Sequence, residues 1–300
     1  MRILLTGKMG QVGFELRRSL AILGHVRAIG SGDCDFRDEL AIREAVRDYR
    51  PNVIVNPAAY TAVDQAESDS ELAYSINARA PTILAEEAQS INAIMVHYST
   101  DYVFDGSNAG GYVEADTPRP LGVYGASKLC GECGVARACK RHIILRTSWV
   151  LGANGRNFAR TILRLGSEKE VLSVVSDQWG SPTSASILAD ITAHVVRQVV
   201  DTDSNYGLYH VAGVGKISWH AYAVYVINRA REAGLLLRVS PDRIKAITTA
   251  EYPTAAKRPV NSYLDSSRIN NIFGIHVPDW KIGVDHVLDQ IISTNYANKS

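Results

Sequence analysis

Gly7-Lys8-Met9-Gly10-Gln11-Val12-Gly13 directly follows the first apolar run of the chain and precedes an amphipathic segment. Glycines spaced in this way between a strand and a helix allow a tight turn, a close approach of backbone amides to a pyrophosphate, and close packing of helix on sheet. The amino terminus of the helix adds partial positive charge. We therefore predict a dinucleotide site at this turn, with Gly7 and Gly10 beside the cofactor.

Around this turn, short β-branched runs alternate with longer helical patterns, which is typical of a parallel sheet covered on both faces. The expected strands are 2–6, 26–29, 53–56, 94–98 and 143–146, and the expected helices are 11–23, 38–48 and 64–89. These patterns predict an α/β fold with a doubly wound parallel sheet of the Rossmann type.

The alternation loosens after Trp149, where helical patterns are separated by Gly, Pro and Ser clusters. We therefore expect a dinucleotide-binding domain over 1–150 and a smaller C-terminal lobe over 151–292, which mainly binds substrate and sends some segments back to the first domain. The polar residues 293–300 are expected to form a fraying tail.

The charge balance excludes a polyanion-binding surface, because 32 Lys and Arg residues face 31 Asp and Glu residues for a net charge of +1. Nucleic acid is therefore not an expected partner. No apolar run approaches the ~18 residues that a membrane span requires, and no leader pattern is visible, so we expect a cytoplasmic protein. Cys130-x-x-Cys133 lacks a second ligand pair, which favours helix packing over a metal site.

Tyr124-Gly125-Ala126-Ser127-Lys128 places a phenol and an ammonium one helical turn apart on one face. A tyrosine with an ordinary pKa near ~10 becomes a better proton donor when a nearby ammonium stabilises its phenolate. Tyr124 is therefore predicted to protonate a developing alkoxide.

Ser99-Thr100-Asp101-Tyr102 follows the fourth expected strand, at the end where open α/β sheets bind ligands. The Thr100 hydroxyl would orient a carbonyl and stabilise charge on its oxygen as hydride arrives. No metal ligand set and no Ser-His-Asp triad is visible in the motifs, so reduction of a carbonyl by a nicotinamide is the simplest reaction. His97 and His210 lie in apolar strand-like runs and are interpreted as structural histidines.

Two further stretches bear on the cofactor. The third expected strand leads into Asn56-Pro57-Ala58-Ala59-Tyr60-Thr61, where the small Ala58 and Ala59 would let a flat cofactor approach, although a compact strand-to-helix turn is an equal alternative. The second expected strand ends in Gly30-Ser31-Gly32, with only Asp33 and Asp35 close behind. Because no acid stands at its tip to bind a ribose 2′-hydroxyl, the choice between NADH and NADPH stays open.

Along nearly its whole length, the chain resembles the dTDP-4-dehydrorhamnose reductase family of extended short-chain dehydrogenases. Besides the glycine turn and Tyr124-x-x-x-Lys128, the resemblance rests on stretches at 53–59, 61–64, 97–105 and 146–149 and on Arg258-Pro259. It implies NAD(P)H-dependent reduction of the 4-keto group of dTDP-4-dehydro-L-rhamnose to dTDP-L-rhamnose, which supplies cell-surface polysaccharide synthesis. The alternatives are a reductase or epimerase on another nucleotide sugar, or a regulatory subunit like that of methionine adenosyltransferase.

The resemblance also implies a role for each site residue. Gly10, Gln11 and Val12 would hold the pyrophosphate, Asp35 and Phe36 the adenine, and Ala59, Tyr60 and Thr61 the nicotinamide half, with Tyr98 behind the pocket. Thr100, Tyr124 and Lys128 would be catalytic, and Tyr124 and Lys128 would also bind the cofactor. Thr100, Asp101, Tyr102, Trp149 and, from the second lobe, Arg258 would contact the nucleotide sugar.

Some relatives in this family hold magnesium at a dimer contact. Here Glu15 matches one of the acids, whereas Ser186 and Gln290 stand where carboxylates are expected. No metal is therefore assigned, and a homodimer is left open.

Overall fold

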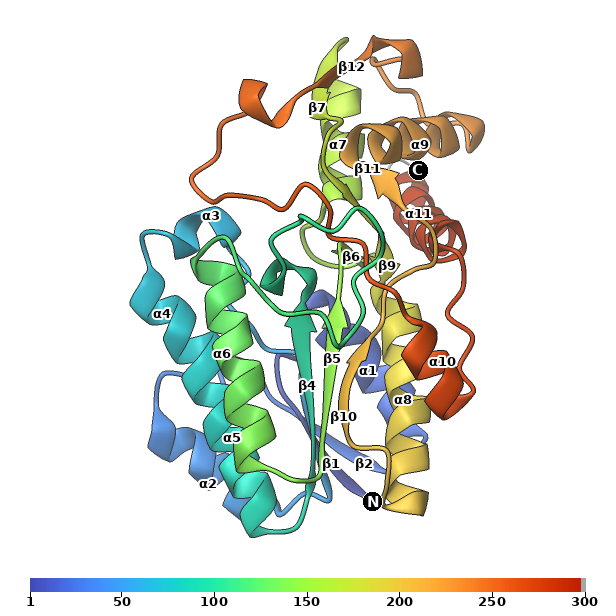
Figure 1. The fold of residues 1–300 in the computed structure, drawn as a ribbon. Helices are drawn as coiled ribbons and strands as arrows, with labels where there is room; N and C mark the ends of the chain where they lie inside the picture. The colour runs from blue at the N-terminus through green and yellow to red at the C-terminus, as the bar shows by residue number, and fades with distance from the viewer. Residues whose placement is uncertain (298–300) are drawn as a thin grey trace.

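A six-stranded parallel sheet is the centre of the computed structural model, which describes residues 1–297 (Figure 1). In spatial order its strands are β10 (Gly207–His210), β5 (His142–Thr147), β4 (Ile94–Thr100), β3 (Val53–Asn56), β1 (Arg2–Leu5) and β2 (His25–Ala28). The order reverses at β1, which pairs with β2 on one side and β3 on the other. Ligands of such sheets bind at the carboxyl ends of the strands beside this reversal. The predicted Rossmann-type fold is confirmed.

Helices cover both faces of the sheet, which explains why every residue of the inner strands β3 and β4 is buried. Neighbouring residues of β1 show this directly, because Leu5 and Leu4 are both buried but join different apolar clusters on opposite faces. On one face lie α1 (Gln11–Ala21), α8 (Ala185–Thr202) and α10 (Ser267–Phe273); on the other lie α2 (Glu39–Tyr49), α5 (Ala80–Ser90) and α6 (Val123–Ala138).

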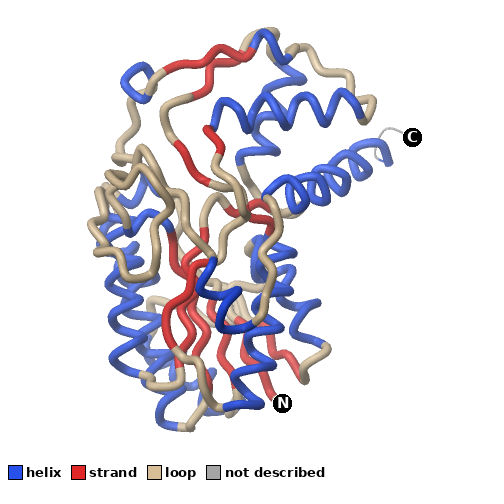
Figure 2. Tube along the Cα trace, turned by 45° about the vertical axis from the view of Figure 1, so that its right-hand side comes forward, coloured by secondary structure: helices blue, strands red, loops and turns tan. Residues whose placement is uncertain are grey.

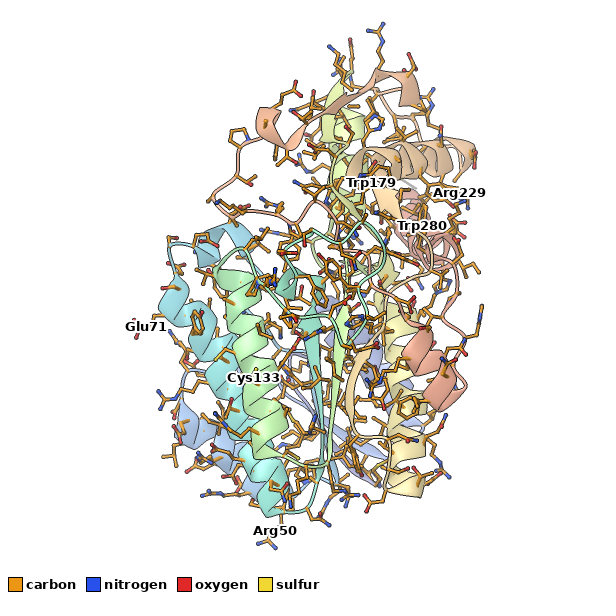
Figure 3. All side chains as sticks on the ribbon, viewed as in Figure 1. Arg50, Glu71, Cys133, Trp179, Arg229 and Trp280 are labelled. Atoms are coloured by element: carbon orange, nitrogen blue, oxygen red, sulfur yellow. The ribbon has the colours of Figure 1, made fainter. Side chains whose placement is uncertain are left out.

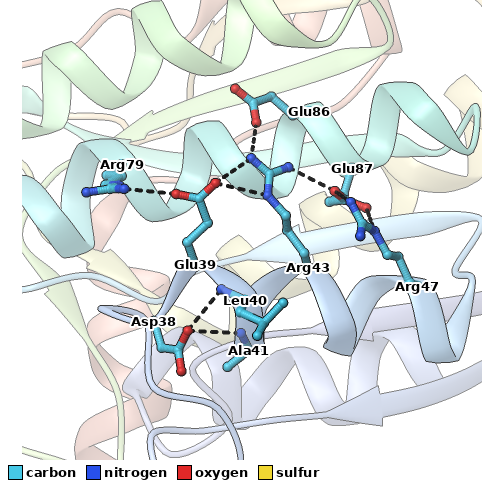
Figure 4. A network of polar contacts seen from close by, with 9 residues as sticks. All are labelled: Asp38, Glu39, Leu40, Ala41, Arg43, Arg47, Arg79, Glu86 and Glu87. Atoms are coloured by element: carbon cyan, nitrogen blue, oxygen red, sulfur yellow. Dashed lines mark hydrogen bonds and ion pairs between the residues drawn. The ribbon is translucent and has the colours of Figure 1, made fainter.

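A network of ion pairs joins α2 to α5 at the edge of the second face (Figure 4). Glu87 is only 3% exposed and accepts hydrogen bonds from both Arg43 and Arg47. Arg43 also reaches Glu39 on its own helix and Glu86 on α5. These contacts hold the register between the two helices.

The single helix predicted over 64–89 is wrong. The chain forms α3 (Val63–Ala66), α4 (Ser70–Tyr74), a π-helical turn η1 (Ser75–Arg79) and then α5. The break falls at polar residues that compete for backbone hydrogen bonds, and the Ser68 hydroxyl donates to the Gln65 carbonyl at 3.0 Å. The wider π turn places Asn77 where its side chain can bond to the loop after β3.

The second lobe has its own apolar core, separate from the two faces of the sheet. Three helices build it together with a parallel strand pair; they are α7 (Phe158–Glu168), α9 (Trp219–Glu232), α11 (Trp280–Ala297), β7 (Leu172–Val175) and β12 (Ile244–Ile247). Figure 2 shows this lobe above the sheet, and Figure 3 places Trp280 and Arg229 within it.

Short strand pairs and turns complete the two lobes. The pairs are β6 (Val150–Leu151) with β9 (Thr183–Ser184), and β8 (Trp179–Gly180) with β11 (Ile217–Ser218); the 3-10 turns are η2 (Asp101–Val103), η3 (Pro241–Arg243) and η4 (Thr249–Glu251). Later parts of the chain return to the first lobe, since β10 pairs with β5 and α8 packs on α1.

Helix α11 continues through residues 293–297, so this part of the predicted tail has a helical backbone, and residues 298–300 lie outside the described structure. None of the helices in the described residues combines the length and apolar character needed to cross a bilayer.

Candidate active site

The glycine turn lies between β1 and α1, where the sheet order reverses. Gly7 adopts a left-handed conformation with φ of 58°, and a Cβ on Gly13 would lie 2.0 Å from the Gly7 carbonyl oxygen. Gly7 therefore makes the turn, and Gly13 lets α1 approach it. Among the described residues, no side chain caps α1 at Gly10. The first-turn amides of α1, including those of Gln11 and Val12, thus suit a pyrophosphate.

Lys8 lies within this turn, and the sequence motifs predicted no role for its side chain. Its Nζ lies 2.7 Å from Asp33 Oδ2, and Asp33 also accepts from the Gly30 amide at 2.7 Å. The lysine and the acid thus meet at the tip of β2, where the adenosine ribose of a dinucleotide is expected. A cation inside a glycine turn was the signal in the sequence.

The side chain of Gln11 joins the glycine turn to the second lobe. Its Oε1 accepts from the Gly152 amide at 2.8 Å and from Asn157 Nδ2 at 2.9 Å. The side chain is therefore engaged with the loop before α7, and only the backbone of Gln11 remains for the predicted pyrophosphate contact.

The two residues expected at the adenine follow the tip of β2. Arg37 pairs with Asp35 at 2.6 Å and lowers the pKa of that carboxyl to about 2. Phe36 is half-buried and packs on the core beneath α2. Their proposed contacts with adenine remain predictions.

The loop after β3 carries the residues expected at the nicotinamide. A Cβ on Gly7 would lie 3.0 Å from the backbone of Ala58, so the glycine turn and this loop are in close contact. The loop is held by buried Asn77, whose Oδ1 accepts from the Tyr60 amide at 2.8 Å and whose Nδ2 donates to the Tyr60 carbonyl at 3.1 Å and to Ser127 at 3.0 Å. Ala59 is half-buried and Thr61 is exposed. No motif marked Asn77, because it lies in a segment predicted as ordinary helix.

Thr100 and Tyr124 meet at the carboxyl end of β4. The Thr100 hydroxyl lies near the phenol and acts to lower the pKa of Tyr124. The Thr100 hydroxyl donates to Asp101 Oδ1 at 3.0 Å and accepts from the Tyr102 amide at 3.2 Å. Asp101 Oδ2 accepts from Ser148 at 2.9 Å. Asp101 is only 2% exposed, so it lies behind Thr100 instead of facing a substrate.

The predicted lowering of the Tyr124 pKa is wrong. Burial raises the pKa of Tyr124 to about 12, and the nearby Thr100 hydroxyl opposes this shift only partly. The expected ammonium is directed elsewhere, because Lys128 Nζ donates to the Tyr98 carbonyl at 2.6 Å. Tyr124 is therefore a neutral phenol at physiological pH, which is the form that a proton donor needs.

Lys128 is 2% exposed and lies beneath Tyr124 on α6. Burial lowers its pKa to about 8, against the opposing effect of Glu132. Its neighbours include His97 Nε2 at 3.5 Å, and Tyr98 itself bonds through its hydroxyl to Thr192 at 2.5 Å. Both histidines that were interpreted as structural, His97 and His210, are fully buried and hydrogen bonded.

A return segment of the chain closes the mouth of this site. Arg258 Nη2 pairs with Asp64 Oδ2 at 2.7 Å, and its positive charge acts on the nearby Tyr102 hydroxyl. The Tyr102 and Tyr124 rings meet edge to face, with centroids 5.6 Å apart. A small pocket opens beside them; its walls are Val63, Glu67, Tyr102, Leu121, Gly122, Tyr124, Gly125, Ala256, Lys257 and Pro259.

Comparison with known proteins assigns this architecture to a family. A family model described as the RmlD substrate binding domain matches residues 1–293. The chain belongs to the RmlD family. The resemblance inferred from the motifs is thereby confirmed.

Curated relatives of this RmlD-family chain include the dTDP-4-dehydrorhamnose reductases of Escherichia coli and Burkholderia thailandensis. The first is 45% identical, over 98% of this chain and 99% of the relative. The second is 41% identical, over 98% of this chain and 100% of the relative.

Solved structures named dTDP-4-dehydrorhamnose reductase share the fold. The Clostridium acetobutylicum protein matches with a TM-score of 0.88 and 37% identity, covering 96% of this chain and 99% of that chain. The Bacillus anthracis protein, solved in complex with NADP, matches with a TM-score of 0.85 and 34% identity, covering 98% of this chain and 99% of that one.

Trp149 of this RmlD-family protein lies where β5 leads into the second lobe. Its backbone is left-handed, with φ of 45°, and its ring stacks on Trp219 with centroids 3.4 Å apart. A Cβ on Gly180 would lie 2.5 Å from the Trp149 ring. The ring therefore belongs to an aromatic cluster of the second lobe, and its predicted contact with a sugar stays a prediction.

The residues considered for metal or cysteine chemistry are dispersed. Glu15 lies 3.9 Å from Arg18, and Ser186 bonds to Ser184 at 3.3 Å. Within residues 1–297, no group of three or more His, Cys, Asp or Glu residues is placed to hold a metal ion.

Cys130 and Cys133 are free thiols on α6. Contrary to the packing predicted for them, both are exposed, and Figure 3 labels Cys133.

Asp101→Asn should change how stability depends on pH. Burial raises the pKa of Asp101 to about 6, whereas an unfolded aspartate titrates near ~3.9. Between these pH values the folded state binds more protons than the unfolded state, so this group makes wild-type stability fall as pH rises. The variant lacks that penalty. Its free energy of unfolding relative to wild type should therefore increase by up to roughly 3 kcal/mol between about pH 4 and 7, measured by urea denaturation.

Asp105→Asn is the matched control, because hydrogen bonds from Ser107 hold the pKa of Asp105 below its usual value. A lowered pKa stabilises the protein above the unfolded pKa and loses that effect as pH falls. The stability of this variant relative to wild type should therefore decrease as pH rises toward about pH 4 and change little between pH 4 and 7. The same pH dependence for both variants would contradict the burial of a charged Asp101.

Proposed function

We propose that this protein reduces the 4-keto group of dTDP-4-dehydro-L-rhamnose to dTDP-L-rhamnose with NADPH or NADH, in the cytoplasm, for cell-surface polysaccharide synthesis. The observation that carries the proposal is that Thr100, at the carboxyl end of β4, lies beside the neutral phenol of Tyr124 on α6. Support comes from the relatives, which are named dTDP-4-dehydrorhamnose reductases over nearly the whole chain, one of them solved with NADP. All residues invoked come from one chain, so the proposal requires no second copy.

The cofactor would be held by the glycine turn and the loop after β3. The uncapped first turn of α1 would bind the pyrophosphate. Gly7 and Ala58 are in close contact, so the glycine turn and the loop after β3 would together form one wall of the nicotinamide pocket. When bound, the nicotinamide supplies the hydride. Lys8 at the tip of β2 offers a cation to a 2′-phosphate, although Asp33 competes for it. We therefore expect NADPH and NADH both to be used, with NADPH having the lower KM.

Tyr124 would give its proton to the former carbonyl oxygen as the alcohol forms. A phenol with a pKa of about 12 is fully protonated before the reaction, and an alkoxide is a stronger base than its phenolate, so the transfer is downhill. The Thr100 hydroxyl would orient the same oxygen. Asp101 would act through Thr100, because its carboxylate accepts a hydrogen bond from the Thr100 hydroxyl and its own side chain is buried.

The nucleotide sugar would enter through the pocket beside Tyr124. Tyr102 lines this pocket, and Arg258, held between Asp64 and Tyr102, stands at its edge with a fixed positive charge suited to a diphosphate. Trp149 would bound the sugar from the second lobe. These assignments are proposals that substitution of each residue can test by its effect on the KM for the sugar.

Incubation of the purified protein with dTDP-4-dehydro-L-rhamnose and either NADPH or NADH tests the function. We expect nicotinamide absorbance to fall by one equivalent for each dTDP-L-rhamnose formed. UDP- and GDP-linked 4-keto sugars serve as controls for the nucleotide. Product formation without net use of reductant would indicate an epimerase, and no reaction with either cofactor would refute the proposal.

A further inference from the structure

The buried polar side chains of Thr6, Asn56 and His97 form a row that ends at Lys128, and the reaction proposed above uses none of the three. Thr6 Oγ1 lies 2.5 Å from Asn56 Oδ1, Asn56 Nδ2 lies 3.1 Å from His97 Nδ1, and His97 Nε2 lies 3.5 Å from Lys128 Nζ. Thr6, Asn56 and His97 are 0% exposed, and Lys128 is 2% exposed. Buried polar groups at this density are costly unless each is paired, so the arrangement calls for an explanation.

The parallel sheet creates this row. Thr6 follows β1, Asn56 ends β3, and His97 lies in β4 directly opposite Asn56. The Thr6 amide donates to the Val55 carbonyl, which keeps the first two side chains in register. Lys128 reaches the end of the row from α6, whose other contacts place Tyr124 at the site.

Burial and the charge of Lys128 determine the protonation state of His97. Burial, and then the charge of Lys128, hold the pKa of His97 well below its usual value, so the ring is neutral and has one donor and one acceptor nitrogen. If Nε2 carried the proton, two donors would face each other 3.5 Å apart in a dry interior. Nε2 is therefore the acceptor, and the proton is on Nδ1.

Asn56 can meet this requirement. The two ends of its amide are similar in shape, so its oxygen can face His97 while its nitrogen donates to Thr6, whose hydroxyl can donate or accept. Every polar atom of the row then has a partner. The Asn56 oxygen would accept from His97 Nδ1 and fix the tautomer.

We propose that His97 is a positioning residue for Lys128. Asn56 keeps His97 neutral with its proton on Nδ1, so that Nε2 accepts a hydrogen bond from the Lys128 ammonium. The Tyr98 carbonyl accepts a second hydrogen bond from the same ammonium at 2.6 Å. The ammonium has three protons, so the third remains for a ligand hydroxyl in the crevice. His97 would thus determine how Lys128 presents itself to the nicotinamide ribose. The role of that ribose contact rests on the proposed function, whereas the tautomer does not.

Nuclear magnetic resonance of the protein with 15N-labelled histidine tests the tautomer without any turnover. We expect the His97 signals, identified by their loss in His97→Gln, to show a protonated Nδ1 and an unprotonated Nε2 at mildly acidic and neutral pH, below the Lys128 pKa of about 8. Asn56→Ala removes the side-chain contact but keeps the Asn56 backbone carbonyl, which also acts on His97, so it should weaken this preference without abolishing it. An Nε2-protonated or a charged His97 in the wild-type protein would overturn the proposal.

Three substitutions test the positioning role through the dissociation constant of NADPH, followed by protein fluorescence. The amide oxygen of His97→Gln reaches the Nε2 position and should keep affinity within about threefold. His97→Asn reaches only the Nδ1 position and should weaken binding by roughly tenfold or more, as expected for losing a hydrogen bond to a charged group. His210→Gln is the matched control, since His210 is equally buried but contacts Tyr112 and Arg146 instead.

Melting temperatures separate positioning from a merely structural role. Rescue by Gln but not Asn, at similar melting temperatures, would support the proposal. Equal loss in both His97 variants, or a loss in His210→Gln of the same size, would overturn it. Because binding and tautomer are measured without the sugar, failure of the reductase assay would leave this result standing.

Discussion

Tyr124→Phe should lower kcat by roughly a hundredfold to ten-thousandfold, the usual contribution of a positioned general acid. The substitution removes the phenol hydroxyl beside Thr100 and leaves a ring of nearly the same shape against Tyr102. Binding of NADPH should change little, because the glycine turn and the loop after β3 are untouched. The check is a steady-state assay with dTDP-4-dehydro-L-rhamnose, alongside cofactor affinity by fluorescence.

Tyr112→Phe provides the control for removing a tyrosine hydroxyl elsewhere. Tyr112 is also buried, and its hydroxyl donates to Asp105 at 3.0 Å, away from Tyr124. This variant should keep kcat within a few-fold of wild type while losing about 1 kcal/mol of stability. A Tyr124→Phe enzyme with the wild-type rate would remove Tyr124 from the mechanism.

Arg146→Leu should destabilise the fold by about 3–5 kcal/mol, because it leaves a buried carboxylate without its partner. Arg146 on β5 donates to Glu132 on α6 through two bonds of 2.8 and 2.6 Å, and their side chains are 3% and 6% exposed. The guanidinium also lies 5.1 Å from the centre of the Phe104 ring. Urea denaturation should show the loss, and the melting temperature should fall by roughly 10 °C.

Two further variants distinguish the cost of leaving the buried Glu132 carboxylate unpaired from the cost of losing an ion pair as such. The double variant Glu132→Leu with Arg146→Leu removes both charges and should recover much of the stability, since apolar pairs often replace buried ion pairs without loss. Arg164→Leu breaks an ion pair with Glu168 whose side chains are 60% and 50% exposed, and should cost less than about 1 kcal/mol. If Arg146→Leu and the double variant lost similar amounts of stability, the unpaired charge of Glu132 would not be the cause of the destabilisation.

The glycine turn and the alternating apolar runs were enough to predict the sheet, because both are local patterns with a fixed geometric meaning. Gly7 must adopt positive φ and Gly13 must admit a neighbouring carbonyl, and no other residue does either as easily. The helix predicted over 64–89 failed for the opposite reason. Its π turn places Asn77 against the loop of Tyr60 and Ser127, and no local pattern records these long-range contacts.

The sequence was also informative about the reacting groups but not about their electrostatics. Tyr124 and Lys128 share a helix face by spacing alone, and Thr100 ends a strand. Whether the ammonium reaches the phenol depends on what else is near it. Here the Tyr98 carbonyl and His97 hold Lys128, and burial raises the pKa of Tyr124 to about 12.

By itself, then, the sequence determined the Rossmann-type sheet, because spacing along one strand or helix sets which face a side chain occupies. It also predicted the place of the dinucleotide and the phenol, ammonium and hydroxyl proposed to react. Only the tertiary structure decided which charges are paired. Lys8 with Asp33, Arg258 with Asp64, and Asp101 behind Thr100 each join residues from different elements. Protonation depends on burial and on such long-range neighbours, and both arise only when the chain is folded.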